Sequence, residues 1–285
     1  MKLTRSGTSP LRTWFSKCRA ILLAFPVLFL SGCFQIEDVL HLKPDGSGTV
    51  EQTVTMSTAM INQLKQMQAG NGQPDAAAKP FELLDESKLK DQAKKMGDGV
   101  TFVSAKKIST PTSEGFTAIF AFTDVSKLKL SPEPPNMGPG VTTKTDDSKA
   151  MTFQFKKGKI AELRISNPSA PKADDPQKPK EAEAPAKEDP SAEAMTAMMM
   201  QALKDMRIAV RVQAEGTITD TNGKYRDGSK VTLMDVDFNK ILADPAKAKQ
   251  LMKASDENSP ENVKLLQSVP GVQFEAANPV IIHFQ

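Results

Sequence analysis

Residues 34–56 read FQIEDVLHLKPDGSGTVEQTVTM, and their pattern predicts the first element of the fold. Apolar and polar residues alternate on both sides of a short turn, which is the period of a strand with one buried face. The turn, Pro44 to Gly48, contains residues that favour tight reversals of the chain. We therefore expect a β-hairpin beginning at Phe34, with these apolar positions on its inner face: Phe34, Ile36, Leu40, Leu42, Val50, Val54 and Met56.

The same one-sided alternation recurs along the chain and predicts about nine strands in all. Further strands are expected at residues 100–108, 116–122, 151–155, 160–165, 208–218, 231–238 and 272–284. Apolar residues at helical spacing predict helices near residues 60–67, 89–96 and 195–206. Two more helices are expected after Asp244-Pro245 and Ser259-Pro260, where an N-cap residue precedes a proline. One apolar face per strand favours an α+β fold, an antiparallel β-sheet with amphipathic helices packed on one face.

Residues 168–194 differ in composition from the rest of the chain. They contain six prolines and eleven charged residues but no Val, Ile, Leu, Phe or Met. Such a segment cannot bury enough apolar surface to offset the entropy of ordering it. We interpret it as a disordered insertion, rich in proline, alanine and charge. Residues 33–167 and 195–285 are then two parts of a single α+β domain.

Composition excludes some classes of function. The chain has 285 residues, 39% hydrophobic and 25% charged, so a packed core is expected. Its formal charge of +3 includes five bases in residues 1–32, without which 32 bases remain against 34 acids. The resulting charge of −2 for the remainder argues against nucleic-acid partners and against a polybasic membrane face.

The first 32 residues have the three parts of a secretory signal: a basic stretch, an apolar run and small residues at the exit. The apolar run has 11 residues, whereas a membrane-spanning helix needs about 20. The next four positions resemble the bacterial lipobox throughout: Leu30, Ser31, Gly32 and Cys33. Resemblance to that class implies that a diacylglyceryl group joins the Cys33 thiol and that residues 1–32 are removed as a signal peptide. Cleavage falls between Gly32 and Cys33, and the new amino terminus is then acylated.

Lipid on Cys33 also predicts the location of the protein. Two or more acyl chains, such as diacylglycerol plus palmitate, hold a protein firmly on a membrane. Cys18 lies in the leader, so Cys33 is the one cysteine of the mature sequence and no internal disulfide is possible. We expect a lipid-anchored protein on the extracytoplasmic side of the bacterial cell envelope. Phe34 follows the cysteine, so the aspartate-type inner-membrane retention signal is absent and the choice of membrane stays open.

Few residues qualify as catalytic. His41 and His283 fall on the polar phase of their strands, where exposed cross-strand positions are expected. The sequence has no nucleophile elbow, P-loop or zinc-protease motif. Asp235 and Asp237 share one strand face and are the best acid–base pair, although solvent-side strand residues are the favoured interpretation. We predict a protein that is not an enzyme, with a carboxylate-based hydrolase as the less favoured alternative.

Two segments weakly resemble metal sites. Asp220 to Lys224 resemble part of a calcium loop, but a lysine stands at a ligand position and no glutamate follows, which favours a hairpin loop. The methionines between Met195 and Met206 could bind Cu(I), but their helical spacing explains nearly all of them as core residues. We predict no metal and no cofactor beyond the covalent lipid.

Methionine-bearing helices above a phenylalanine-rich sheet face could also enclose an apolar cavity. The phenylalanines of that face are Phe116, Phe120, Phe122, Phe153 and Phe155. A filled core is the favoured interpretation, and a hollow one is the alternative.

Two blocks of sequence resemble a known family. Val39–Met56 predict a strand, a Pro-Asp-Gly-Ser-Gly turn and a second strand close behind the lipobox cysteine. Ile208–Leu242 predict a strand, Asn-Gly and Asp-Gly turns, a strand and a helix. Both blocks are similar to parts of the mycobacterial LppM-type lipoproteins. The resemblance implies one α+β domain that binds lipid-like molecules at the envelope, and it supplies no catalytic residue; the charged insertion is a departure from that family.

These patterns together predict a membrane-anchored bacterial lipoprotein whose extracytoplasmic domain binds a lipid-like or other apolar ligand. The alternative is a structural or assembly protein of the envelope that binds a protein partner.

Overall fold

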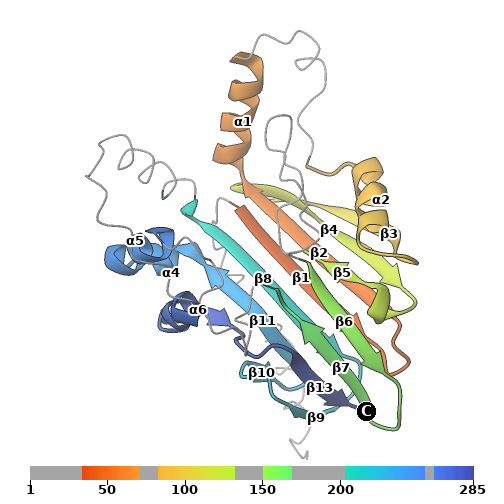
Figure 1. The fold of residues 1–285 in the computed structure, drawn as a ribbon. Helices are drawn as coiled ribbons and strands as arrows, with labels where there is room; N and C mark the ends of the chain where they lie inside the picture. The colour runs from red at the N-terminus through yellow and green to blue at the C-terminus, as the bar shows by residue number, and fades with distance from the viewer. Residues whose placement is uncertain (1–33, 71–82, 132–149, 169–199, 201–202, 254–259) are drawn as a thin grey trace, which may run out of the picture. The chain divides into compact units, whose positions relative to one another are not determined.

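The computed structural model describes residues 34–70, 83–131, 150–168, 200, 203–253 and 260–285. All of them belong to one compact unit, Ser31–Gln285. Within them the chain forms two β-sheets and several short helices, as Figure 1 shows. The α+β class expected from the sequence is confirmed.

The larger sheet has eight strands in the described part of the chain. Their order is β10 (Arg226–Asp227), β11 (Lys230–Asp237), β8 (Met206–Ala214), β1 (Phe34–Leu42), β2 (Gly48–Ser57), β4 (Ser113–Phe122) and β3 (Thr101–Ser109), with β12 (Gln273–Phe274) beside β11. The central strand β1 pairs antiparallel with β2 and parallel with β8. The hairpin predicted from residues 34–56 is confirmed, with Phe34 opposite Met56.

The smaller sheet contains five described strands. Their order is β5 (Lys129–Leu130), β6 (Met151–Lys156), β7 (Ala161–Ser166), β13 (Val280–Phe284) and β9 (Ile218–Thr221), and all the pairings are antiparallel. Each sheet joins strands from both sides of the predicted insertion, because β8 pairs with β1 and β13 pairs with β7. The insertion itself, apart from residue 168, lies outside the described residues.

The described helices are α1 (Thr58–Gly70), α2 (Glu86–Lys95), α4 (Phe238–Leu242), α5 (Pro245–Lys253) and α6 (Pro260–Gln267), with a 3₁₀ turn η1 (Val125–Lys127). The two predicted proline starts are confirmed, since α5 and α6 each begin at the proline. Asp244 caps α5 by accepting hydrogen bonds from the backbone N–H groups of Ala246 and Lys247, each at 3.2 Å. Local capping chemistry therefore sets where α5 begins.

The inner faces of the two sheets form one hydrophobic core. Val50 and Phe120 of the larger sheet share it with Leu163 and Ile282 of the smaller sheet, and Leu89 of α2 joins them. A smaller cluster lies between β11, β12 and the helices α4, α5 and α6. Because each sheet covers the apolar face of the other, sheet-on-sheet packing supplies most of the burial that stabilises the domain.

Two predicted strands are each divided between the sheets. Gly216, at φ +143°, follows the end of β8, and Ile218 then starts β9 in the other sheet. The strand expected at residues 272–284 likewise becomes β12 in one sheet and β13 in the other. The expected single sheet is therefore two. Hydrophobic alternation continues across the β8–β9 break because it reports which face is buried and not which sheet a strand joins.

The prediction of a helix over residues 195–206 is wrong at the carboxy-terminal end of that range. Met206 is the first residue of β8 and lies opposite Phe34. Asp205, at φ +63°, turns the chain into the strand immediately before it. Residues 200 and 203 are helical, and most of the expected helix lies outside the described residues. An apolar side chain at position 206 fits the strand pattern as well as the helical one, so spacing alone placed it in the wrong element.

Replacing Phe120 with alanine should lower the free energy of unfolding by about 3–5 kcal/mol. Phe120 is 0% exposed and packs edge-to-face on Phe102, with ring centroids 6.1 Å apart. Urea unfolding followed by circular dichroism measures the change. The control is Val103→Ala on the edge strand β3, where a side chain that is 57% exposed should change stability by less than about 0.5 kcal/mol. Equal losses in the two variants would contradict the inter-sheet core.

Candidate functional site: a buried carboxyl group on the central strand

The central strand carries an acidic residue on its buried face. Buried and partly exposed residues alternate along β1, and Asp38 occupies a buried position between Ile36 and Leu40. Its side chain is 0% exposed. The sequence contained the signal, because Asp38 stands where the inner-face alternation of β1 calls for an apolar residue. A single aspartate matches no catalytic or binding motif, so motifs do not reveal it.

A chain of two side-chain hydrogen bonds connects Asp38 with helix α2, which packs against the inner face of the larger sheet. Gln92 of α2 donates from Nε2 to Oε1 of Gln52 at 2.9 Å. Gln52, directly opposite Asp38 on β2, donates from Nε2 to Oδ1 of Asp38 at 3.0 Å. The second oxygen, Oδ2, is buried and has no hydrogen-bond partner among the described residues. One carboxyl oxygen therefore has a hydrogen-bond donor, whereas the other is enclosed in the core without one among the described residues.

Burial shifts the protonation of this group. It raises the pKa of Asp38 from 3.8 to about 7, with the Gln52 hydrogen bond lowering it in part and the charge of Glu37 raising it. Near neutral pH the carboxyl group is present both as the acid and as the anion, so Oδ2 can either donate or accept a hydrogen bond. A buried polar atom without a partner costs about 1–3 kcal/mol. A bound molecule with a complementary polar group would remove that cost.

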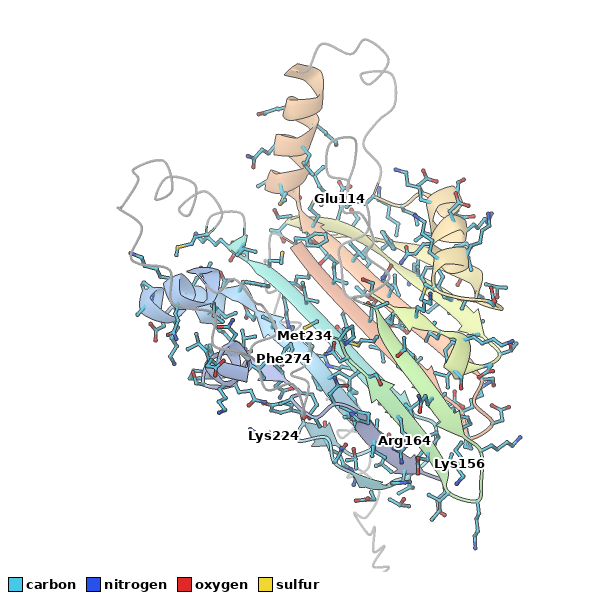
Figure 2. The ribbon with its side chains drawn as sticks, viewed as in Figure 1. Glu114, Lys156, Arg164, Lys224, Met234 and Phe274 are labelled. Atoms are coloured by element: carbon cyan, nitrogen blue, oxygen red, sulfur yellow. The ribbon has the colours of Figure 1, made fainter. Side chains whose placement is uncertain are left out.

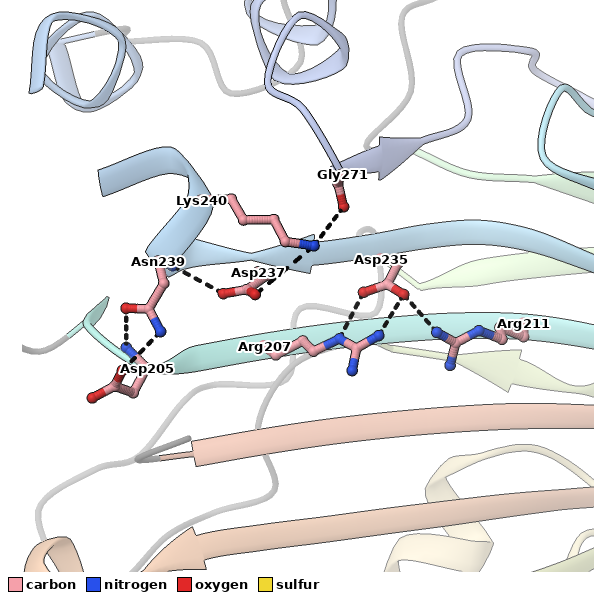
Figure 3. Close-up of polar contacts among 8 residues, drawn as sticks. All are labelled: Asp205, Arg207, Arg211, Asp235, Asp237, Asn239, Lys240 and Gly271. Carbon is pink, nitrogen blue, oxygen red and sulfur yellow. Dashed lines mark hydrogen bonds and ion pairs between the residues drawn. The ribbon is translucent and has the colours of Figure 1, made fainter. Parts of the chain in front are cut away.

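The outer face of the larger sheet carries a network of charges, drawn in part in Figure 3. Arg207 donates two hydrogen bonds to Asp235, from Nε to Oδ1 at 2.8 Å and from Nη2 to Oδ2 at 2.7 Å. Arg211 donates from Nη2 to the same Oδ2 at 2.5 Å and also pairs with Glu37 of β1. Burial raises the pKa of Asp235, but the hydrogen bonds and charge of Arg207 and the charge of Arg211 outweigh it, so the pKa lies below 3.8. Asp235 is thus a fully paired anion near neutral pH.

Asp237 has a different role from Asp235. It caps α4 by accepting a hydrogen bond from the backbone N–H of Asn239 at 3.0 Å, and its Oδ2 lies 4.0 Å from Nζ of Lys240 (Figure 3). The two carboxylates that the sequence offered as an acid–base pair therefore have separate partners. Asp235 joins β11 to β8 through the two arginines, and Asp237 joins β11 to α4. No contact between the two carboxylates is present among the described interactions.

Both histidines occupy cross-strand positions on polar sheet faces, as expected. His283 of β13 lies between two acids, with Nε2 3.1 Å from Oε2 of Glu162 and Nδ1 3.6 Å from Oδ2 of Asp220. His41 of β1 has Nε2 3.9 Å from Oε2 of Glu51. The side chains of His283 and His41 are 31% and 34% exposed, respectively. The sequence predicted exposed positions, and neighbouring side chains cover both histidines in part.

The segment Asp220 to Lys224 is the end of β9 and the loop that follows it. Asn222 accepts a hydrogen bond from the backbone N–H of Ile281 at 2.7 Å and donates to the carbonyl of Pro279 at 3.0 Å. These contacts fasten the loop to β13. Among the described residues, no group of three or more His, Cys, Asp or Glu side chains is arranged to hold a metal ion. Met195 to Met199 lie outside the described residues.

The phenylalanines predicted to line an apolar interior all belong to the inter-sheet core. Four of them are buried and Phe155 is partly exposed: Phe116, Phe120 and Phe122 on β4, and Phe153 and Phe155 on β6. They come from both sheets, which face each other, so the cover over the larger sheet is the second sheet and not methionine-bearing helices. Ile36 and Leu40, which flank Asp38 on β1, belong to the same core.

Comparisons with known proteins give little information about this site. No family model matches the chain, and no curated protein matches it. Among solved structures, the chain is weakly similar to the NMR structure of the folded domain of the Mycobacterium tuberculosis LppM protein. The sequence identity is 14% and the TM-score 0.31, over 72% of this chain and 83% of that one. A TM-score at this level carries no functional residue from that domain to this chain.

The predicted lipidation site lies outside the described residues, which begin at Phe34. Leu30, Ser31, Gly32 and Cys33 therefore stay a prediction from the sequence. In the described portion, no helix is both long and apolar enough to cross a membrane.

Asp38→Asn should remove a pH dependence of stability. Because the folded-state pKa of about 7 lies above the ordinary value of 3.8, the folded chain holds an extra proton between these two pH values. The contribution of Asp38 is therefore greatest below about pH 4 and is lost as the pH rises to about 7, by at most roughly 4 kcal/mol.

Urea unfolding at a series of pH values tests this, with Asp91→Asn as the matched control. The Asp91 side chain is 65% exposed on α2, and its hydrogen bond with Lys94 holds its pKa below 3.8. Its replacement should therefore leave the wild-type pH profile in place between about pH 4 and pH 7. A pH profile in Asp38→Asn that matches the wild type would show that Asp38 titrates normally.

Proposed function

We propose that this chain is the precursor of a bacterial lipoprotein, anchored through lipid on Cys33, whose extracytoplasmic α+β domain binds a lipid-like ligand without acting on it. The leader and the Leu30–Cys33 lipobox support the anchor. The unpaired Oδ2 of Asp38, within an apolar core, supports the binding role. This single observation carries the ligand proposal.

The chemistry around Asp38 defines the class of ligand. The core on either side of it is aliphatic and aromatic, which suits a hydrocarbon chain or ring. The free carboxyl oxygen suits one polar group on that hydrocarbon, such as a hydroxyl or an amide. The Gln92 and Gln52 side chains hold the carboxyl group in place from the α2 side. We therefore propose an amphiphile as the ligand, with its polar group against Oδ2 of Asp38.

A non-enzymatic role agrees with the state of the other candidate groups. Asp235 is paired with two arginines, and Asp237 caps a helix. A general acid or base needs a carboxyl or imidazole group that can exchange its proton with a substrate in a cleft. Asp38 can titrate near neutral pH, but its hydrogen-bonded partner is a glutamine, which cannot relay a proton as an acid or base does.

Lipidation is tested by growth with radiolabelled palmitate and by mass spectrometry of the amino-terminal peptide. We expect label in the wild type and a diacylglyceryl mass on Cys33. Cys33→Ser should lose both the label and the membrane association, because two or more acyl chains are what hold the mature protein on the bilayer. An unlabelled wild type, or a Cys33→Ser protein that is processed and stays on the membrane as before, would remove the lipoprotein assignment.

Ligand binding is tested on protein purified from membranes in a mild detergent. Organic solvent should extract a non-covalent amphiphile from the wild type, while the lipid on Cys33 stays with the protein. Asp38→Asn should retain several-fold less of that amphiphile, because an amide cannot provide the carboxylate acceptor. Asp91→Asn, which changes an exposed carboxyl group, should retain as much as the wild type. Recovery of no amphiphile, or of equal amounts from all three proteins, contradicts the proposal.

A further inference from the structure

The predicted anchor joins the folded domain with no linker. Phe34 is already part of β1, is 3% exposed and pairs with Met56 on one side and Met206 on the other. Consecutive Cα atoms lie about 3.8 Å apart across a trans peptide. A lipid on Cys33 would therefore hold the amino-terminal end of β1 close to the membrane surface.

The strand register shows which parts of the domain share that end of the larger sheet. Glu114 of β4 pairs with Met56 of β2, and Ser109 of β3 pairs with Glu114. Figure 2 shows Glu114 beside the base of α1 and Lys156 at the opposite end of the strands. The end that carries Phe34 therefore also carries the start of α1 and the turn between β3 and β4. On the β8 and β11 side the same end carries Asp205 and the start of α4. We call residues 58–66 of α1 and residues 110–112 of this turn the anchor-end surface.

The helix of the anchor-end surface suits a membrane interface. Among residues 58–66, Lys65 is the one charged residue. Ile61 is buried in the core, whereas Asn62 and Gln63 are exposed. The backbone N–H of Thr58 donates to the carbonyl of Thr112 at 3.0 Å, which fixes the helix to the turn. Figure 1 shows α1 continuing past the end of β2. Uncharged polar and apolar groups of this kind lose little on approaching lipid headgroups.

The outer face of the larger sheet suits a membrane less well. It carries Glu37, Glu51, Arg211 and Asp235, and bringing these charges against lipid would remove water from them. The mature chain also lacks the excess of bases that draws a protein face onto anionic lipid. Contact through α1 and the β3–β4 turn avoids that desolvation, because Asp205, Asp237 and Lys240, which are charged groups at this end of the sheet, lie on the β8 and β11 side.

We infer that the anchor-end surface rests on the bilayer that holds Cys33, with β1 leading away from the membrane. The partner is the zwitterionic lipid surface itself, and the inference rests on the proposed lipidation. β1 has nine residues, so Leu42 lies roughly 26 Å along the strand from Phe34. The turn between β1 and β2 is then the part of this hairpin farthest from the lipid.

Site-directed fluorescence tests the orientation in full-length lipidated protein. The Cys33 thiol is occupied by lipid, so a cysteine introduced elsewhere is the one free thiol for a fluorophore. The variants are Gln63→Cys and Thr112→Cys on the anchor-end surface, Asp45→Cys in the β1–β2 turn and Glu51→Cys on the outer face. The proteins are inserted into phosphatidylcholine vesicles that contain a lipid with a headgroup spin label. Circular dichroism confirms that each variant is folded.

Spin-label quenching should be about twofold or more stronger at residues 63 and 112 than at residue 45, because the far turn is roughly 26 Å along β1. Residue 51 should also be weakly quenched. Equal quenching at residues 63 and 45, or the strongest quenching at residue 51, would overturn the inferred orientation. Mass spectrometry of the same samples separates the two proposals. Lipidated protein with even quenching contradicts the orientation alone, whereas an unmodified Cys33 contradicts both.

Discussion

The whole domain depends on the burial of one face of β1 while the strand is paired on both edges. Its partners are β2, which follows it in the chain, and β8, which begins more than 160 residues later, and the register is continuous with both. A one-residue slip on either side would move Ile36 and Leu40 from the core to the outer face. Burial of these side chains therefore fixes how the amino-terminal and carboxy-terminal parts of the chain meet.

The same register places Asp38 in the core, where an ionisable group opposes folding. Gln52 satisfies one of its oxygens, and Gln92 supports Gln52 from α2. An apolar residue at position 38 would remove the desolvation penalty, so stability alone does not account for the aspartate. Retaining a costly group at the centre of the sheet is understandable if the group contacts a ligand. This is the physical reason for connecting Asp38 with binding.

Acidic side chains on the two faces of β1 differ in whether a cationic group pairs with them. On the outer face, Glu37 shares Arg211 with Asp235, and every carboxylate of this network has a guanidinium partner. On the inner face, Asp38 has no cationic partner in the described interactions, and burial raises its pKa. The outer network is complete in itself and ties β1, β8 and β11 together. On the inner face, Oδ2 of Asp38 has no hydrogen-bond partner among the described residues. The amino-terminal end of β1 also adjoins the predicted anchor, so the proposed ligand and the membrane would both contact β1.

Local chemistry in the sequence was sufficient for the α+β class, for the hairpin at residues 34–56 and for the helix starts at Pro245 and Pro260, because each depends on neighbouring residues. The division into two sheets was not accessible in the same way. Residues 208–218 alternate without a break, and only the long-range pairings of β8 with β1 and β9 with β13 reveal that the chain changes sheets after Ala214. Asp38 was visible as an interruption of the apolar pattern, but its hydrogen bonding was not, because Gln52 and Gln92 come from other elements of the fold. The alternation of apolar and polar residues follows from the burial of one face of a single strand. Strand pairing and the hydrogen bonds of buried side chains depend instead on distant segments that packing brings together.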